Sequence, residues 1–125
     1  MLIDEFMKKD LIIRTKKFAY SCIDLCMQLS NNYLGNHVKG QLIRSSTSVA
    51  ANYRATCHAQ SKPSFVAKIS IAVEECDESE FWLQLIIDKE LIKKEEVLLL
   101  LKEGNELTSI FVASRRTASN SIKQD

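Results

Sequence analysis

Four segments of this chain repeat apolar and small residues at alternating spacings of three and four, and this pattern constrains the fold most strongly. Such spacing places residues on one side of an α-helix, as left-handed bundle packing requires. It predicts helices over residues 4–30, 38–60, 63–88 and 95–122. The predicted core stripes are Leu11, Thr15, Phe18, Cys22, Leu25 and Leu29; Leu42, Ser45, Val49, Asn52 and Thr56; Phe65, Ile69, Ala72, Cys76, Ser79, Leu83 and Ile86; and Val97, Leu101, Gly104, Thr108, Phe111, Arg115, Ala118 and Ile122.

Turn-forming residues are scarce, because the 125 residues include only 3 Gly and 1 Pro. A sandwich or barrel of many short strands needs more of them. The breaks between the predicted helices are short, and short connections place consecutive helices antiparallel. Ser61 is the expected cap of the third helix, with Pro63 in its first turn. We therefore expect an all-α single domain, residues 1–125, folded as an antiparallel up-down-up-down four-helix bundle.

Several predicted helices carry apolar residues on more than one side. A helix in a monomeric bundle buries one face, so additional apolar faces indicate a partner surface. One interpretation is a wide core stripe with Trp82 at its edge. The other is a cyclic homo-oligomer, with a candidate interface formed by Phe81, Trp82, Leu85, Leu98 and Leu99.

No segment is apolar enough to predict a membrane span. The longest uninterrupted apolar run, Val97 to Leu101, is far shorter than the roughly 20 residues that cross a bilayer. The first residues lack the apolar region and small-residue cleavage site of a secretion signal. We expect a cytoplasmic protein with reduced thiols and no membrane partner.

The residues that carry metal or catalytic chemistry do not fall into known patterns. A di-iron bundle needs Glu three positions before His, but Leu34 and Ala55 stand three positions before His37 and His58. Cys22 and Cys26, or Cys57 and His58, could form a soft-metal site; the alternative is that the cysteines pack as small apolar residues. Ser45 to Ser48 are of a size that permits close helix approach. We expect no metal, cofactor, catalytic residue or small-molecule substrate, and therefore not an enzyme.

Asn52 lies on the predicted core stripe of the second helix, where an unpaired amide would cost roughly 1–3 kcal/mol. Glu75 is the candidate partner, and Glu78 flanks the same side of the third helix. We interpret these residues as an internal polar pair that fixes helix register. A buried catalytic carboxylate pair is the alternative.

Charge is sorted along the chain although the net charge is only +1. Residues 31–73 contain no Asp or Glu, whereas residues 74–106 are rich in both. This arrangement fits either head-to-tail self-association or binding of an anionic partner such as RNA or DNA. The candidate basic contacts are Lys39, Arg44, Arg54, His58 and Lys62, joined by Lys8, Lys9, Lys16 and Lys17.

Two motifs resemble a known family. QLIRSSTSVAANYRA, residues 41–55, resembles the second-helix motif of the small bundle proteins encoded in intervening sequences of bacterial 23S ribosomal RNA genes. EECDESEFWLQLI, residues 75–87, resembles the third-helix pattern of that family. Positions that match the motifs are Gln41, Arg44, Asn52, Glu75 and Glu78.

The resemblance implies a ring-shaped homopentamer without enzymatic activity. It also implies that Arg44 positions helices or meets glutamates of a neighbouring subunit. A relative in the same fold, the accessory variability determinant of diversity-generating retroelements, binds a reverse transcriptase and nucleic acid. We therefore expect a non-enzymatic oligomeric scaffold, with a nucleic-acid-binding accessory protein as the alternative.

Overall fold

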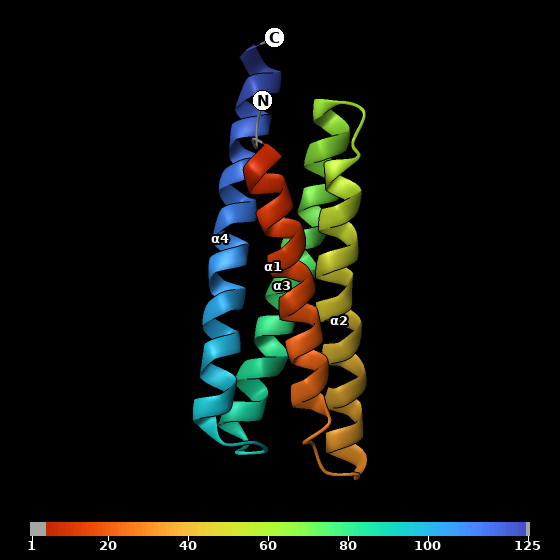
Figure 1. The fold of residues 1–125 in the computed structure, drawn as a ribbon, viewed down its shortest axis with the longest axis vertical. Coiled ribbons are helices and arrows are strands. Elements are labelled where there is room, and N and C mark those ends of the chain that lie inside the picture. The colour runs from red at the N-terminus through yellow and green to blue at the C-terminus, as the bar shows by residue number, and fades with distance from the viewer. Residues whose placement is uncertain (1–4, 125) are drawn as a thin grey trace.

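The computed structural model describes residues 5–124 and contains four helices (Figure 1). They are α1 (Glu5–Cys26), α2 (Tyr33–Cys57), α3 (Lys62–Asp88) and α4 (Lys94–Gln124). The described residues contain no strand, so the predicted all-α fold is confirmed. Residue 4, at which the first predicted helix begins, lies outside the described range.

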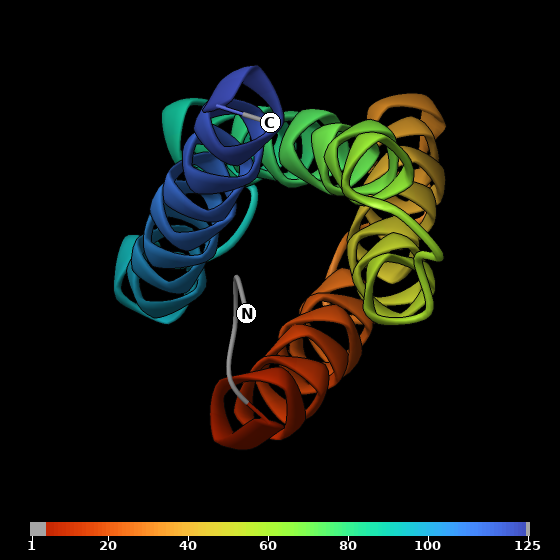
Figure 2. The same cartoon turned by 90° about the horizontal axis from the view of Figure 1, so that it is seen from above.

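The chain runs down α1, up α2, down α3 and up α4, so that α1 begins and α2 ends at the same end of the molecule (Figure 1). Seen along its length, the molecule has a C-shaped cross-section with α1 and α4 at the two tips (Figure 2). Each helix packs closely on its neighbour in sequence, whereas α1 and α4 touch only sparsely. The boundary between α1 and α4, here called the α1–α4 seam, is therefore the least closed part of the fold.

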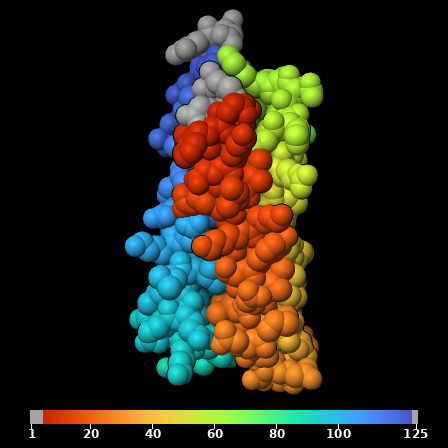
Figure 3. Space-filling model, in the orientation of Figure 1, coloured from red at the N-terminus to blue at the C-terminus, as the bar shows by residue number. Residues whose placement is uncertain are grey.

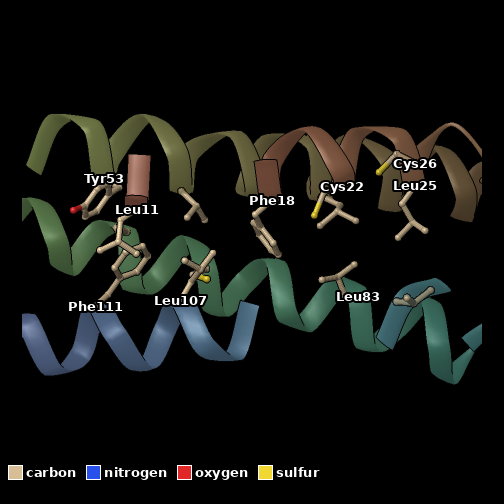
Figure 4. Packing of buried hydrophobic residues seen from close by; sticks show 14 of the residues in the cluster. Leu11, Phe18, Cys22, Leu25, Cys26, Tyr53, Leu83, Leu107 and Phe111 are labelled. Carbon is tan, nitrogen blue, oxygen red and sulfur yellow. The ribbon is translucent and has the colours of Figure 1, made fainter. Parts of the chain in front are cut away.

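The core is built from the helical stripes (Figure 4). Every residue of the stripes predicted for α1 and α3 is buried. In α4 the stripe is displaced, because Leu107 and Ser114 are buried while Leu101 and Arg115 are only half-buried. Spacing by threes and fours is therefore sufficient to locate the buried face of a helix, but not every residue at its edge.

The predicted stripe of α2 is wrong at one position. Tyr53 is completely buried, whereas the adjacent Asn52 is only half-buried. The Tyr53 ring stacks on Phe111 of α4, with centroids 5.4 Å apart and ring planes 16° from parallel. An aromatic ring gains more from burial than an amide does, and this contact turns Tyr53 rather than Asn52 toward the core.

α2 begins five residues before the predicted start at residue 38, because Gly35 lies inside the helix rather than in a turn. Asn32 caps the helix, and its side-chain oxygen accepts a hydrogen bond from the Gly35 nitrogen at 2.7 Å. A Cβ on residue 35 would lie 2.0 Å from the Ser30 carbonyl oxygen. Only glycine permits this close approach of the preceding loop.

The remaining helix ends are close to the predicted ones. α1 ends at Cys26 rather than at residue 30, and single turns continue to Leu29, which is still buried. At the start of α3 the Ser61 side chain accepts a hydrogen bond from the Ser64 nitrogen at 3.2 Å, as predicted. The adjoining Pro63 occupies the first turn, where its missing N–H costs nothing.

Candidate functional site

The boundary between α2 and α3, here called the α2–α3 seam, is closed by polar contacts. Arg44 of α2 pairs with Glu75 of α3 at 2.9 Å and also with Glu78. Partial burial alone would raise the pKa of Glu78. Hydrogen bonds from Trp82 and Arg44 outweigh that effect and hold the pKa of Glu78 below its ordinary value. Arg44 thus joins two helices of its own chain.

Deeper in the α2–α3 seam, two serines allow the helices to approach closely. The Ser79 hydroxyl donates to the Ser45 hydroxyl at 2.9 Å, and both residues are fully buried. This contact fits the sequence-based interpretation of Ser45 as a residue that permits close helix approach. The seam therefore has little room for an additional group.

Three aromatic rings lie at the outer side of the α2–α3 seam and form what we call the aromatic cluster: His37, Phe81 and Trp82. The centroid of Trp82 lies 5.5 Å from that of His37 and 5.0 Å from that of Phe81, both edge to face. The indole N–H of Trp82 donates to Glu78 at 3.1 Å. Trp82 is thus held in place, while Phe81 remains 59% exposed.

The predicted pairing of Asn52 with Glu75 is wrong. The Asn52 amide nitrogen donates to the Ser48 carbonyl and hydroxyl oxygens of its own helix, at 2.9 and 2.8 Å. Glu75 instead accepts from Arg44. Because Asn52 is only half-buried and satisfied within α2, its amide does not need a carboxylate from α3.

The α1–α4 seam is bridged at its middle by Arg14 of α1. Its guanidinium contacts Glu103 at 2.6 Å and 3.0 Å, and Glu106 at 3.0 Å. These two-pronged contacts to Glu103 are the strong form of the arginine–carboxylate pair. Sequence reasoning missed this bridge, although Glu103 and Glu106 lie one turn apart on α4, at a spacing that suits one shared partner.

Beside this bridge, a groove of about 770 Å³ lies between the C-terminal half of α1 and the first turns of α4. These two segments adjoin in the lower part of the face in Figure 3, where α1 is orange and α4 is cyan. Phe18 and Leu25 line its inner side, Leu99 and Leu100 its α4 side, and Lys17 one rim. Leu99 is 74% exposed. The rest of the lining is polar or charged: Arg14, Ser21, Asp24, Gln28, Glu96 and Glu103. The groove is therefore open to solvent and only partly apolar, with Leu99 as its most exposed apolar residue.

The five residues of the predicted oligomer interface do not form one surface. Leu99 lines the α1–α4 groove, whereas Leu98, 42% exposed, points about 100° away around α4. Phe81 belongs to the aromatic cluster with the half-buried Trp82. Leu85 packs against the core. The exposed apolar residues thus lie on at least two sides of the protomer.

The predicted basic residues have unlike surroundings. Arg44 is engaged by two glutamates, and the Lys62 amine lies 2.6 Å from the Ser121 hydroxyl. Lys39 is half-buried. Arg54 and His58 are exposed and form no ion pair with any described residue. Only part of the predicted basic set is therefore available to a partner.

Three of the four cysteines are buried, as the core interpretation predicts: Cys22, Cys26 and Cys76; Cys57 is half-buried. Burial raises the pKa of Cys26 to about 11 and that of Cys76 to about 12. Both are therefore protonated at neutral pH rather than nucleophilic thiolates.

Across residues 5–124, no three His, Cys, Asp or Glu side chains are grouped so that they could hold a metal ion. The helices within the same residues all lack the length and hydrophobicity of a membrane span.

Residues 9–113 match the family described as 23S rRNA-intervening sequence protein. A solved structure of a protein of unknown function from the S23 ribosomal protein family of Bacteroides thetaiotaomicron is similar, with a TM-score of 0.78 and 29% sequence identity. The similarity covers 88% of this chain and 99% of that one. No curated protein is significantly similar in sequence. Since the family match spans most of the chain and includes both sequence motifs, this chain belongs to the 23S rRNA-intervening sequence protein family.

Proposed function

We propose that the chain is a non-enzymatic scaffold subunit that assembles head to tail, with the α1–α4 groove of one subunit receiving Phe81 of the next. The observation that carries the proposal is the groove itself, in which Leu99 is 74% exposed above the buried side chains of Phe18 and Leu25. Burial of such a surface against a second copy removes apolar area from water.

Two unlike surfaces favour a ring over a two-fold dimer. In a two-fold dimer the same patch meets itself, whereas a hollow on one side and an exposed ring on another make a head-to-tail contact. Head-to-tail contacts close into rings when the rotation between subunits permits it. Five subunits is the number that the family resemblance suggests.

One ion pair is available to the proposed contact between these surfaces. Lys17 lies on the rim of the groove, and Asp77 lies one turn before Phe81 on α3. Both are exposed, and neither has an ion-pair partner among the described residues. A neighbour that inserts Phe81 into the groove would bring Asp77 toward Lys17. Asp24 and Glu96 also line the groove, so the proposed contact rests on its apolar residues rather than on net charge.

Two charge variants test the proposal. Leu99→Glu places a charge in the groove, and Phe81→Glu places one on the inserted residue. We expect each variant alone to run as a 14.2 kDa monomer in light scattering. An equimolar mixture should give a heterodimer of twice that mass, because the intact groove of Phe81→Glu can receive the intact Phe81 of Leu99→Glu.

The control is Tyr33→Glu, which charges a residue that is 89% exposed and does not line the groove. It should retain the wild-type mass. Oligomers that persist in both Leu99→Glu and Phe81→Glu, or a mixture of the two that stays monomeric, would contradict the proposed contact.

A nucleic-acid-binding accessory protein is the second candidate function. The observation that favours it is the absence of Asp and Glu from residues 31–73, which include all of α2. Positive charge without nearby carboxylates supplies most of the affinity for a phosphate backbone. The face formed by α1 and α2 is the part of the molecule on which this function would depend.

A further inference from the structure

A second, smaller groove lies between α1 and α2, on the opposite side of α1 from the α1–α4 groove. It has a volume of about 380 Å³. Short or apolar side chains form most of its lining: Ile12, Ala19, Thr47, Ala50 and Ala51. Three longer polar or aromatic side chains complete it: Lys16, Tyr20 and Arg54. These three residues are exposed, and Tyr20 is 56% exposed. A small, open groove thus carries two cations and one aromatic ring.

The cations of this groove are not neutralised by the chain. The Lys16 amine lies 5.8 Å from the centroid of the Tyr20 ring, and neither Lys16 nor Arg54 has an ion-pair partner among the described residues. None of the acids of α1 lines this groove: Glu5 pairs with Lys8, Asp24 lines the α1–α4 groove, and Asp10 is exposed outside it. The positive potential of the groove therefore faces solvent.

Two further basic side chains extend this groove in one direction. Lys9 lies two turns before Lys16 on the same side of α1, and His58 lies one turn after Arg54. Since α1 begins where α2 ends (Figure 1), both additions lie toward the same end of the molecule. The distance from Lys9 to Lys16 along α1 is about 10 Å.

We propose that the α1–α2 groove binds single-stranded nucleic acid, with phosphates on Lys16 and Arg54 and a base stacked on Tyr20. Aromatic side chains set within a basic groove are the elements by which proteins hold single strands without reading their sequence. A duplex keeps its base faces stacked and could not use Tyr20 in this way. This proposal rests on the second candidate function, for which it specifies the ligand, a single strand, and the residues that bind it.

The test is fluorescence anisotropy of the full chain with a labelled 15-nucleotide oligouridylate. Log affinity should fall linearly with log salt, with a slope of about −0.7 per phosphate contact. Lys16→Glu with Arg54→Glu should weaken binding at least about tenfold and make that slope shallower. Tyr20→Leu should weaken binding about tenfold without changing the slope, because it removes stacking alone.

Matched controls separate the site from general charge. Lys102→Glu reverses an exposed base on α4 and should leave affinity within about twofold of wild type. The milder Lys16→Ala with Arg54→Ala should show the same trend, with unchanged circular dichroism. Uridine monophosphate at the same total nucleotide concentration should fail to displace the strand; displacement would indicate a free-nucleotide site and overturn the proposal.

The other outcomes are distinguishable. If the wild-type chain does not bind the strand at low salt, both the site and the second candidate function fall. If it binds but the Lys16 and Arg54 variants bind equally well, only the site is wrong. If those variants instead lower the oligomer mass in light scattering, this face is a subunit interface and the proposal is overturned.

Discussion

The α2–α3 seam and the α1–α4 seam differ in what fills them. In the first, buried Ser45 and Ser79 allow close approach, and Arg44 and the aromatic cluster cover the outer edge. In the second, Arg14 bridges the middle, and a groove of about 770 Å³ remains beside it. The chain closes the α2–α3 seam by itself, whereas the α1–α4 seam stays partly open, and we propose that a second copy completes it.

The largest expected difference between the seams comes from adding bulk to each. Ser79→Leu forces a large side chain into a fully buried position and removes the hydroxyl that donates to Ser45. We expect it to lower the free energy of unfolding by about 3 kcal/mol. Urea unfolding followed by circular dichroism, at a fixed protein concentration, measures the change.

The matched variant is Ser21→Leu, because Ser21 is half-buried and lines the α1–α4 groove. There the new side chain has room, so the free energy of unfolding of the protomer should change by less than about 0.5 kcal/mol. Equal destabilisation by the two substitutions would mean that the α1–α4 seam is packed as tightly as the α2–α3 seam.

Replacing the arginine of each seam should have an intermediate effect on the free energy of unfolding. Arg14 and Glu103 have side chains only 29% and 28% exposed, and they join two helices that otherwise touch sparsely. Arg14→Ala should therefore cost about 1 kcal/mol in thermal or urea unfolding. Arg44 is 49% exposed in a seam that packing already closes, so Arg44→Ala should cost about 0.5 kcal/mol or less. A larger loss from Arg44→Ala would reverse the comparison.

The smallest effects should come from pH. Burial raises the pKa of Glu80, against the opposing hydrogen bond from Thr108, so the folded state holds this proton more tightly than the unfolded chain. That contribution lowers stability as pH rises from about 4.3, the unfolded value, through the folded value. Glu80→Gln should therefore gain stability relative to wild type between pH 4 and pH 7.

Glu78, two residues away on α3, should make stability depend on pH in the opposite direction. Because its pKa is held below the ordinary value, its contribution is present above about pH 4.3 and is lost as pH falls through the folded value. Glu78→Gln should lose stability relative to wild type at pH 7, and the difference should shrink toward pH 3. Melting curves at pH 3, 4 and 7 measure both variants. A change in stability at pH 7 with the same sign for Glu80→Gln and Glu78→Gln would refute these assignments.

The helices and most of their buried faces follow from sequence because they depend on local spacing. The stripe from Phe65 to Ile86 is buried at each predicted position, and the Ser61 cap is the predicted one. The start of α2 is different, since Gly35 lies inside the helix, where its missing side chain leaves room for the Ser30 carbonyl. That is a contact with the preceding loop rather than a property of helix periodicity.

The candidate surfaces depend on how whole helices sit, and this limits what the sequence can predict. Adjacent leucines 98 and 99 face different sides, and only the separation of α1 from α4 makes one of them part of a groove. Asn52 is satisfied by Ser48 within its helix, while Tyr53 takes the core position through Phe111, which is 58 positions away. Such partners become visible only in three dimensions.

The mass of the wild-type chain in solution tests most directly whether the open α1–α4 seam is completed by a second copy. Size-exclusion chromatography with light scattering at micromolar concentration measures it. We predict a single species with a mass that is a multiple of 14.2 kDa, fivefold if the ring is a pentamer, which Leu99→Glu reduces to 14.2 kDa. A wild-type chain that runs as a 14.2 kDa monomer under these conditions would contradict the account.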